Sequence, residues 1–149
     1  MAAQWDMADE VAGEGYGRFV RQFFESMFVP WSDRALAEAI TDRALRIPAA
    51  LGRSLLTNLA GWDAREVESA LNSVRVPLLA IQSTTMDTAR ERVSLDTGRD
   101  SPWLDLVRGR VPEAKIEILS GTGHFPQIEM ADEVTALIAA FALGNQPGH

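Results

Sequence analysis

Apolar and polar positions follow different patterns in the two halves of the chain. From residue 16 to residue 72, apolar side chains recur every three or four positions, which is the spacing of amphipathic helices. The first half of the chain is therefore expected to be helical, with no strand. Four helices are predicted in it, over residues 17–28, 33–46, 48–62 and from residue 63 onward.

Local signals set the expected helix boundaries. Pro30 ends the first helix, Ser32 is placed to cap the second, and Pro48 fits the first turn of the third. Asp63, with Glu66 three residues later, is the start expected of the fourth helix. The leucines of the third helix are predicted to form its buried face: Leu51, Leu55, Leu56 and Leu59.

The second half contains two predicted strands. Residues 74–82 form a nearly continuous apolar run around Pro77, which is typical of a parallel strand buried on both faces. Residues 83–100 are polar without a clear period and predict a long loop. Residues 115–119 (Lys-Ile-Glu-Ile-Leu) alternate as a second strand.

A helix is expected between these strands and another after them. Ser101 followed by Pro102 is a helix start, and the predicted buried face is Trp103, Leu106 and Val107. A strand, a helix and a strand form a βαβ unit, so the two strands should be parallel. The closing helix has its apolar face at Val134, Leu137, Ile138 and Phe141 and ends near Leu143.

The predicted fold class is α/β, with a helical first half followed by a βαβα unit around a small parallel sheet. Four segments are expected: a flexible lead-in over residues 1–15, a helical segment over 16–73, the βαβα part over 74–143, and a tail over 144–149. A parallel sheet of two strands leaves strand edges to be paired, so self-association as a homo-oligomer is a natural expectation.

Composition excludes several classes of function. The net charge of −7 argues against nucleic acid or an anionic membrane as a partner. The chain has no cysteine, which removes disulfides, cysteine-bound zinc and a thiol nucleophile. The acidic N-terminus is unlike a signal peptide, and no apolar run is long enough to span a bilayer, so a cytoplasmic protein is expected. No cofactor is implied.

Candidate chemistry centres on His124. Residues 120–123 (Ser-Gly-Thr-Gly) break the second strand, so His124 sits on a glycine-rich turn just past a strand end. It is the sole histidine besides the C-terminal His149, and an imidazole exchanges protons near neutral pH. The turn is therefore a candidate for acid–base work. The alternative is a surface or helix-capping histidine without chemistry.

A carboxylate is a candidate partner for this histidine. The carboxyl ends of parallel strands lie at one edge of the sheet, which would bring Asp87 towards His124. A carboxylate bonded to one ring nitrogen fixes the tautomer of an imidazole. The alternative is an ordinary loop carboxylate. Asp63 and Asp100 are weaker candidates, since both are explained as helix-start residues.

Residues 123–126 (Gly-His-Phe-Pro), with Ile128-Glu129 and a long amphipathic helix behind them, resemble the last strand, histidine loop and last helix of the α/β-hydrolase fold. The resemblance covers residues 62–143 well and 16–60 only loosely. It implies that His124 is the general base of a Ser-His-Asp/Glu triad. The strand over residues 76–81 is similar to the one before the triad acid, although Ser83 replaces the usual glycine and Asp87 stands one residue late.

The nucleophile that this family requires is missing. The family places its serine in a Gly-x-Ser-x-Gly elbow between a strand and a helix. Residues 52–56 (Gly-Arg-Ser-Leu-Leu) lack the second glycine and lie within a leucine-rich helical pattern. Ser83 is a substitute candidate, because it ends the first strand and would face His124. It lacks the strained turn and visible oxyanion donors.

Two functions follow from these features. The first is hydrolysis of carboxylic esters, with His124 as general base, Asp87 as orienting acid, and a serine that is either non-standard or supplied by a second chain. The second is a truncated, non-catalytic module of hydrolase origin that binds a hydrophobic small molecule or self-associates. Metal catalysis is unlikely from one internal histidine and no cysteine, and residues 120–123 lack the lysine and spacing of a phosphate-binding loop.

Overall fold

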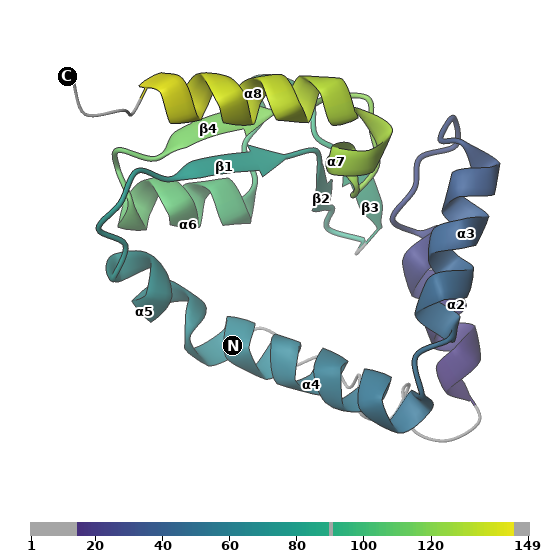
Figure 1. The fold of residues 1–149 in the computed structure, drawn as a ribbon. Coiled ribbons are helices and arrows are strands. Elements are labelled where there is room, and N and C mark those ends of the chain that lie inside the picture. Colours follow the sequence, from purple (N-terminus) through teal and green to yellow (C-terminus); the bar gives the residue numbers. More distant parts are fainter. Residues whose placement is uncertain (1–14, 90, 145–149) are drawn as a thin grey trace. The chain divides into compact units, whose positions relative to one another are not determined.

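The computed structural model describes residues 15–89 and 91–144, so nearly all of the expected lead-in and tail lies outside the described residues. The protein is a mixed α/β chain whose first half is helical and whose two parallel strands lie in the second half among further helices, as predicted (Figure 1). It divides into two compact units. The first contains the chain up to Ser26 and Asp33–Val67, and the second contains Met27–Ser32 and the chain from Glu68 onward.

The first unit is built from α2 (Tyr16–Glu25), α3 (Arg34–Leu45) and α4 (Ala49–Arg65). These three helices confirm the helical prediction for this part of the chain. Their shared core is small, as expected where few helices pack together. Its buried centre is Tyr16, Val20 and Ala44, and the half-buried side chains packed on it are Phe19, Phe24, Leu45, Ala49 and Leu56.

The cap of α3 differs from the prediction. Asp33, not Ser32, is the N-cap, and its carboxylate accepts from the backbone N–H groups of Ala35 at 2.8 Å and Leu36 at 3.2 Å. An ionised carboxylate accepts these bonds better than a hydroxyl and also favours the positive end of the helix dipole. Ser32 is left to act elsewhere, in the second unit.

The predicted buried face of α4 is wrong for three of its four leucines. Leu51, Leu55 and Leu59 are each more than half exposed, whereas Leu56 packs on the core. The reason is Gly52, where a Cβ would lie 1.6 Å from Oη of Tyr16. Because Gly52 has no side chain, the phenol of Tyr16 lies against α4 at this position. The packed side of the helix therefore contains Gly52 and Leu56, and the other three leucines face away from it.

The predicted end of the third helix at residue 62 is also wrong. Helix α4 continues through Gly61 to Arg65, and Asp63 lies within the helix instead of starting a new one. A glycine inside a helix costs only about 1 kcal/mol, which the remaining turns of a long helix offset. The next helix, α5 (Val67–Asn72), begins two residues later.

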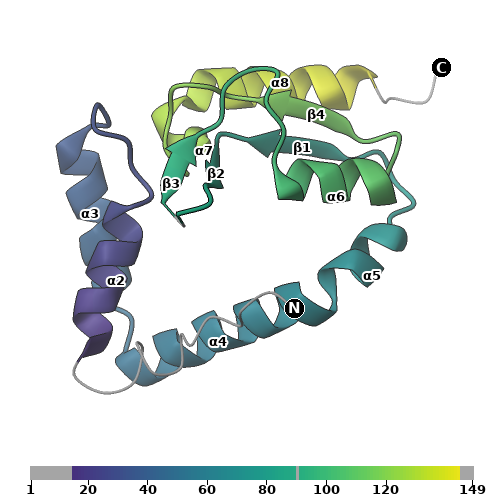
Figure 2. The same ribbon diagram turned by 180° about the vertical axis from the view of Figure 1, so that it is seen from behind.

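The second unit contains the parallel pair, β1 (Leu79–Gln82) and β4 (Lys115–Ile118). The register sets Ala80 beside Ile116, and the two strands confirm the predicted parallel arrangement. Figures 1 and 2 show helices α6 (Pro102–Arg110) and α8 (Ala131–Gly144) on either side of this pair. Neither strand has a second strand partner within the described residues. Self-association through these strand edges, as a homo-oligomer, stays a prediction.

The long loop predicted over residues 83–100 is wrong in its first half. It contains an antiparallel hairpin, β2 (Thr84–Met86) with β3 (Arg92–Ser94). The strands have three residues each, too few for alternation to be recognised in the sequence. The hairpin matters for function, because it brings two polar side chains beside the histidine turn.

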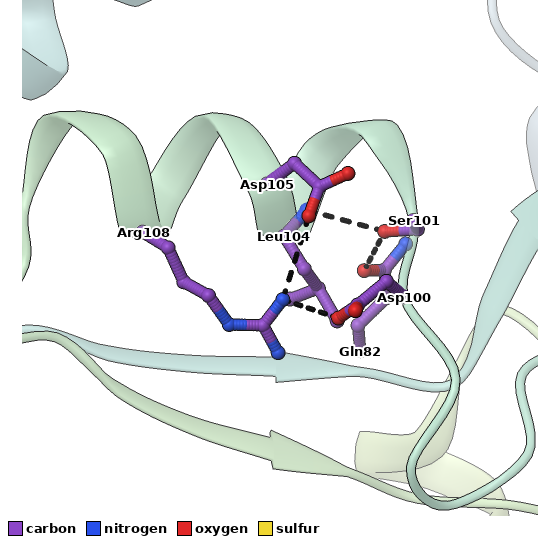
Figure 3. A network of polar contacts seen from close by, with 6 residues as sticks. All are labelled: Gln82, Asp100, Ser101, Leu104, Asp105 and Arg108. Carbon is purple, nitrogen blue, oxygen red and sulfur yellow. Dashed lines mark hydrogen bonds and ion pairs between the residues drawn. The ribbon is translucent and has the colours of Figure 1, made fainter.

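The start of α6 confirms the predicted cap and ties the helix to β1 (Figure 3). The Ser101 hydroxyl accepts from the Leu104 N–H at 3.1 Å and donates to Oε1 of Gln82 at 2.7 Å. Asp100 pairs with Arg108, which agrees with a helix-start role for this acid. The buried face is Leu104 and Val107; Trp103, predicted to be buried, is 41% exposed.

The last two helices follow the histidine turn. Helix α7 (Pro126–Glu129) is a single turn, and α8 begins directly after Met130. The predicted apolar face of α8 is only partly covered, since Val134 is buried but Ile138 is 52% exposed. Among the described residues, no helix combines the length and the apolar character that crossing a bilayer requires.

Candidate functional site

The turn that carries His124 is held by a segment from far earlier in the chain. The backbone N–H of His124 donates to the carbonyl of Met27 at 2.6 Å, and the Trp31 indole N–H donates to the carbonyl of Gly121 at 2.8 Å. Both partners belong to Met27–Ser32, the segment that the second unit includes although it lies between α2 and α3 in sequence. The position of the turn therefore depends on residues that lie far from it in the sequence.

Gly123 permits this close approach. A Cβ at this position would lie 2.5 Å from the carbonyl oxygen of Met27 and 2.6 Å from Oε2 of Glu129. Real Cβ atoms do not come so near to backbone oxygen, so only glycine fits without displacing the backbone. The glycine next to His124 therefore serves packing. A separate glycine, Gly121, has φ +77 and supplies the left-handed turn conformation.

Glu129 is the polar anchor of the same turn. Its carboxylate accepts from the Gly123 N–H at 3.0 Å, from the Thr122 hydroxyl at 3.2 Å and from the Ser32 hydroxyl. Bonds to an ionised acceptor are among the stronger ones in proteins. Glu129 was part of the hydrolase-like pattern, but the sequence assigned it no role; the structure gives it the role of holding the turn.

The ring of His124 contacts the β2–β3 hairpin. Its Nδ1 lies 3.3 Å from the Thr84 hydroxyl and 3.1 Å from Nη1 of Arg92. Arg92 Nη1 also donates to the Thr84 hydroxyl at 3.2 Å. Thr84 is 5% exposed and Arg92 is half-buried, so these three groups form a compact polar cluster. We call Thr84, Arg92 and His124 the histidine cluster.

The cluster fixes the protonation of the ring. A guanidinium has donors only, so Nδ1 must accept, and the neutral imidazole is assigned its proton on Nε2. Partial burial, and then the charge of Arg92, lower the pKa of His124 below its ordinary value of 6.5. His124 is therefore neutral at pH 7 and presents an Nε2–H donor, with its lone pair directed at the hairpin.

We expect His124 to titrate below pH 6.5, and the Arg92→Gln variant to raise its pKa because one of the two causes is removed. Because the pKa of His124 is lower in the folded chain, the unfolded chain binds a proton at this ring first as the pH falls. Stability is therefore full above about pH 6.5 and falls as the pH drops towards the folded pKa. An NMR titration of the ring measures this, with His149→Gln to leave a single imidazole in the spectrum. A His124 pKa at or above 6.5 would contradict the assigned cluster.

The polar groups of the other two predicted site residues, Ser83 and Asp87, are engaged away from the His124 ring. The hydroxyl of Ser83 is buried and donates to the carbonyl of Gly123 at 2.6 Å. The Asp87 carboxylate accepts from the N–H groups of Ala89 at 2.8 Å and Glu91 at 2.9 Å, within its own hairpin turn. Within the described residues, the hydrogen bonds of the His124 ring involve neither of them. Asp87 thus has the alternative role of a loop carboxylate that stabilises a turn.

A cavity of about 230 Å³ opens beside the cluster, at the carboxyl ends of β1 and β4. Its apolar lining comes from Ile81, Trp103 and Pro126. The polar lining residues are Gln82, Ser83, Thr84, His124 and Gln127. Gln82 is fixed on both sides, since its amide N–H also donates to the carbonyl of Thr84 at 2.9 Å. The cavity is the place in the second unit where a small molecule would meet His124.

Sequence reasoning found His124 and the correct edge of the sheet, but not Thr84 or Arg92. Their only signal was a pair of three-residue strands, which no periodicity reveals. In the described ranges no group of three or more histidine, aspartate or glutamate side chains is placed to hold a metal ion. Comparisons of the chain with models of protein families, with curated proteins and with solved structures found no match.

Proposed function

We propose that the second unit binds a small organic molecule in the cavity beside His124 and does not hydrolyse it. The observation that supports this is the orientation of the histidine ring. A general base needs a free lone pair aimed at the substrate or nucleophile. Here the lone pair of Nδ1 faces Arg92 and Thr84, and the second nitrogen is assigned a proton, so His124 is arranged to donate a hydrogen bond.

The unit is also proposed to be a partial α/β-hydrolase fold. The β1–α6–β4 order, with the histidine turn past β4 and α8 behind it, supports this origin. The chain has a histidine turn similar to that of the fold, but it has no elbow serine, and Asp87 is engaged in its own hairpin. A scaffold with a cavity and a hydrogen-bond donor, but without the elbow serine, is suited to binding.

A second candidate is ester hydrolysis, favoured by the Thr84 hydroxyl at 3.3 Å from Nδ1. Hydroxyl and imidazole within hydrogen-bond reach are the minimum for an activated nucleophile. In this case His124 acts as general base through Nδ1, and Thr84 replaces the predicted Ser83. The charge of Arg92 weakens such a base, because it lowers the pKa of the ring.

One experiment separates the two functions. The purified chain is assayed with a short-chain chromogenic ester beside His124→Ala, Thr84→Val and Ser83→Ala. The binding function predicts no turnover above that of His124→Ala. A wild-type rate that falls about 100-fold or more in both His124→Ala and Thr84→Val would instead assign hydrolysis to this pair, as removal of a general base should.

Binding is measured on the same samples. A set of neutral and charged fragments of about eight to ten non-hydrogen atoms is titrated against the labelled chain, and shifts are read at the backbone resonances of the cavity. We expect shifts confined to the lining residues, lost in a variant that fills the cavity such as Ser83→Leu with retained fold. No shift from any fragment would overturn the binding function.

A further inference from the structure

We propose that the ligand of this cavity is a small monocarboxylate with an apolar body, held by the Nε2–H of His124 in the field of Arg92. This rests on the proposed binding function and names its ligand class. The inference rests on charge. Arg92 is a cation beside the cavity, and none of the lining residues is acidic.

Arg92 is a half-buried cation without a counter-charge in the described part of the chain. The ion pairs among the described residues involve four other basic residues, Arg21, Arg108, Arg110 and Lys115, and none includes Arg92. Its Nη1 donates to two neutral groups, Thr84 and His124, and its Nε is buried with no hydrogen-bond partner. A desolvated charge is costly unless an opposite charge lies near. An anion bound close to the histidine cluster would supply this opposite charge.

The cavity lies beside the groups that Arg92 contacts. Two of its lining residues, Thr84 and His124, are the direct hydrogen-bond partners of Arg92. None of the eight lining residues is acidic, although the chain has 21 aspartates and glutamates. Glu129, the acid that holds the turn, is occupied by three donors. A negatively charged ligand in the cavity is therefore attracted by Arg92 and is not repelled by a carboxylate of the lining.

Size and lining select the rest of the ligand. A volume of about 230 Å³ is below the roughly 300–1,000 Å³ of pockets that take drug-sized ligands, so the cavity suits a smaller molecule. Ile81, Trp103 and Pro126 offer an apolar wall. A carboxylate accepts from an imidazole N–H, while its hydrocarbon part lies on this wall. Benzoate has these properties and serves as the probe.

The test compares benzoate with benzamide, its neutral counterpart of nearly equal shape, by NMR titration of the full chain. We expect benzoate to bind about tenfold or more tightly than benzamide, because the guanidinium charge of Arg92 lies on the other side of the imidazole ring and attracts the carboxylate alone. Arg92→Gln should abolish this preference. Arg92→Lys, which keeps the charge, should retain most of it and guards against a loss caused only by a disturbed hairpin.

Arg75→Gln is the matched control. It removes an equal charge just before β1, at the opposite end of the strand from the cavity, and should leave the preference unchanged. Equal binding of benzoate and benzamide, or a benzoate preference that survives in Arg92→Gln, would overturn the carboxylate inference while leaving the binding function intact. If neither compound nor any other fragment shifts the cavity, both fail together.

Discussion

Replacing Gly123 with alanine is expected to destabilise the second unit by about 3 kcal/mol. Overpacking a filled site costs about 1–3 kcal/mol, and a lost backbone hydrogen bond adds about 1 kcal/mol. The new methyl group would meet the Met27 carbonyl oxygen at 2.5 Å, an atom of the backbone that cannot rotate aside. Relief requires moving the turn, which breaks the 2.6 Å bond between the His124 N–H and that oxygen. Urea unfolding followed by circular dichroism measures the change.

Gly109→Ala is the control for this substitution. Gly109 lies in α6, and a Cβ there meets nothing within 4 Å. Alanine favours a helix over glycine by up to about 1 kcal/mol, so the same chemical change should be neutral or stabilising. Similar unfolding midpoints for wild type and Gly123→Ala would show that the turn is not held as closely as these distances indicate.

Removing the carboxylate of Glu129 is expected to have a similarly large effect. Glu129→Ala leaves the Gly123 N–H, the Thr122 hydroxyl and the Ser32 hydroxyl without their acceptor. Thr122 is 3% exposed, so water does not readily replace the lost bond. A buried group left unsatisfied costs about 1–3 kcal/mol, which gives about 3 kcal/mol for the set. The His124 resonances should shift as well, because the turn that carries the ring loses its anchor.

Two further variants test the reason. Glu129→Gln keeps the shape and one acceptor oxygen and should retain part of the lost stability. Glu133→Ala removes an exposed acid from the first turn of α8 and should cost only about 0.5 kcal/mol. Glu129→Ala and Gly123→Ala act on one turn, so their combined effect should be smaller than the sum. A loss from Glu129→Ala no larger than from Glu133→Ala would rule out the anchoring role.

Local pattern predicted much of this fold. Helical periodicity located α2 and α3, the Ser101-Pro102 pair placed the start of α6, and the two apolar strands gave the parallel pair. Each of these depends on residues close together in sequence. The edge of the sheet that carries His124 followed from the strand direction alone. The predicted cap of α3 at Ser32 was wrong by one residue, because Asp33 is also a residue type that caps helices.

What could not be predicted depends on which partner each group meets in the folded chain. The exposed leucines of α4 follow from the fit of Tyr16 beside Gly52, which only the packed helices reveal. Arg92 reaches His124 because two very short strands pair across a turn. Asp87, the predicted orienting acid, is drawn instead to the nearby N–H groups of its own hairpin. A sequence shows which groups are available, but not which of several acceptors a donor will meet.

The segment Met27–Ser32 has a consequence for how the chain folds. The Trp31–Gly121 and Ser32–Glu129 bonds join residues 90 and 97 positions apart. Closing loops of that length costs chain entropy before the contacts repay it, so such contacts form late. During synthesis this segment leaves the ribosome long before its partners exist. The histidine turn therefore completes at the end of folding, and a fragment that starts at residue 68 contains His124 without the carbonyl and the hydroxyl that hold its turn in place.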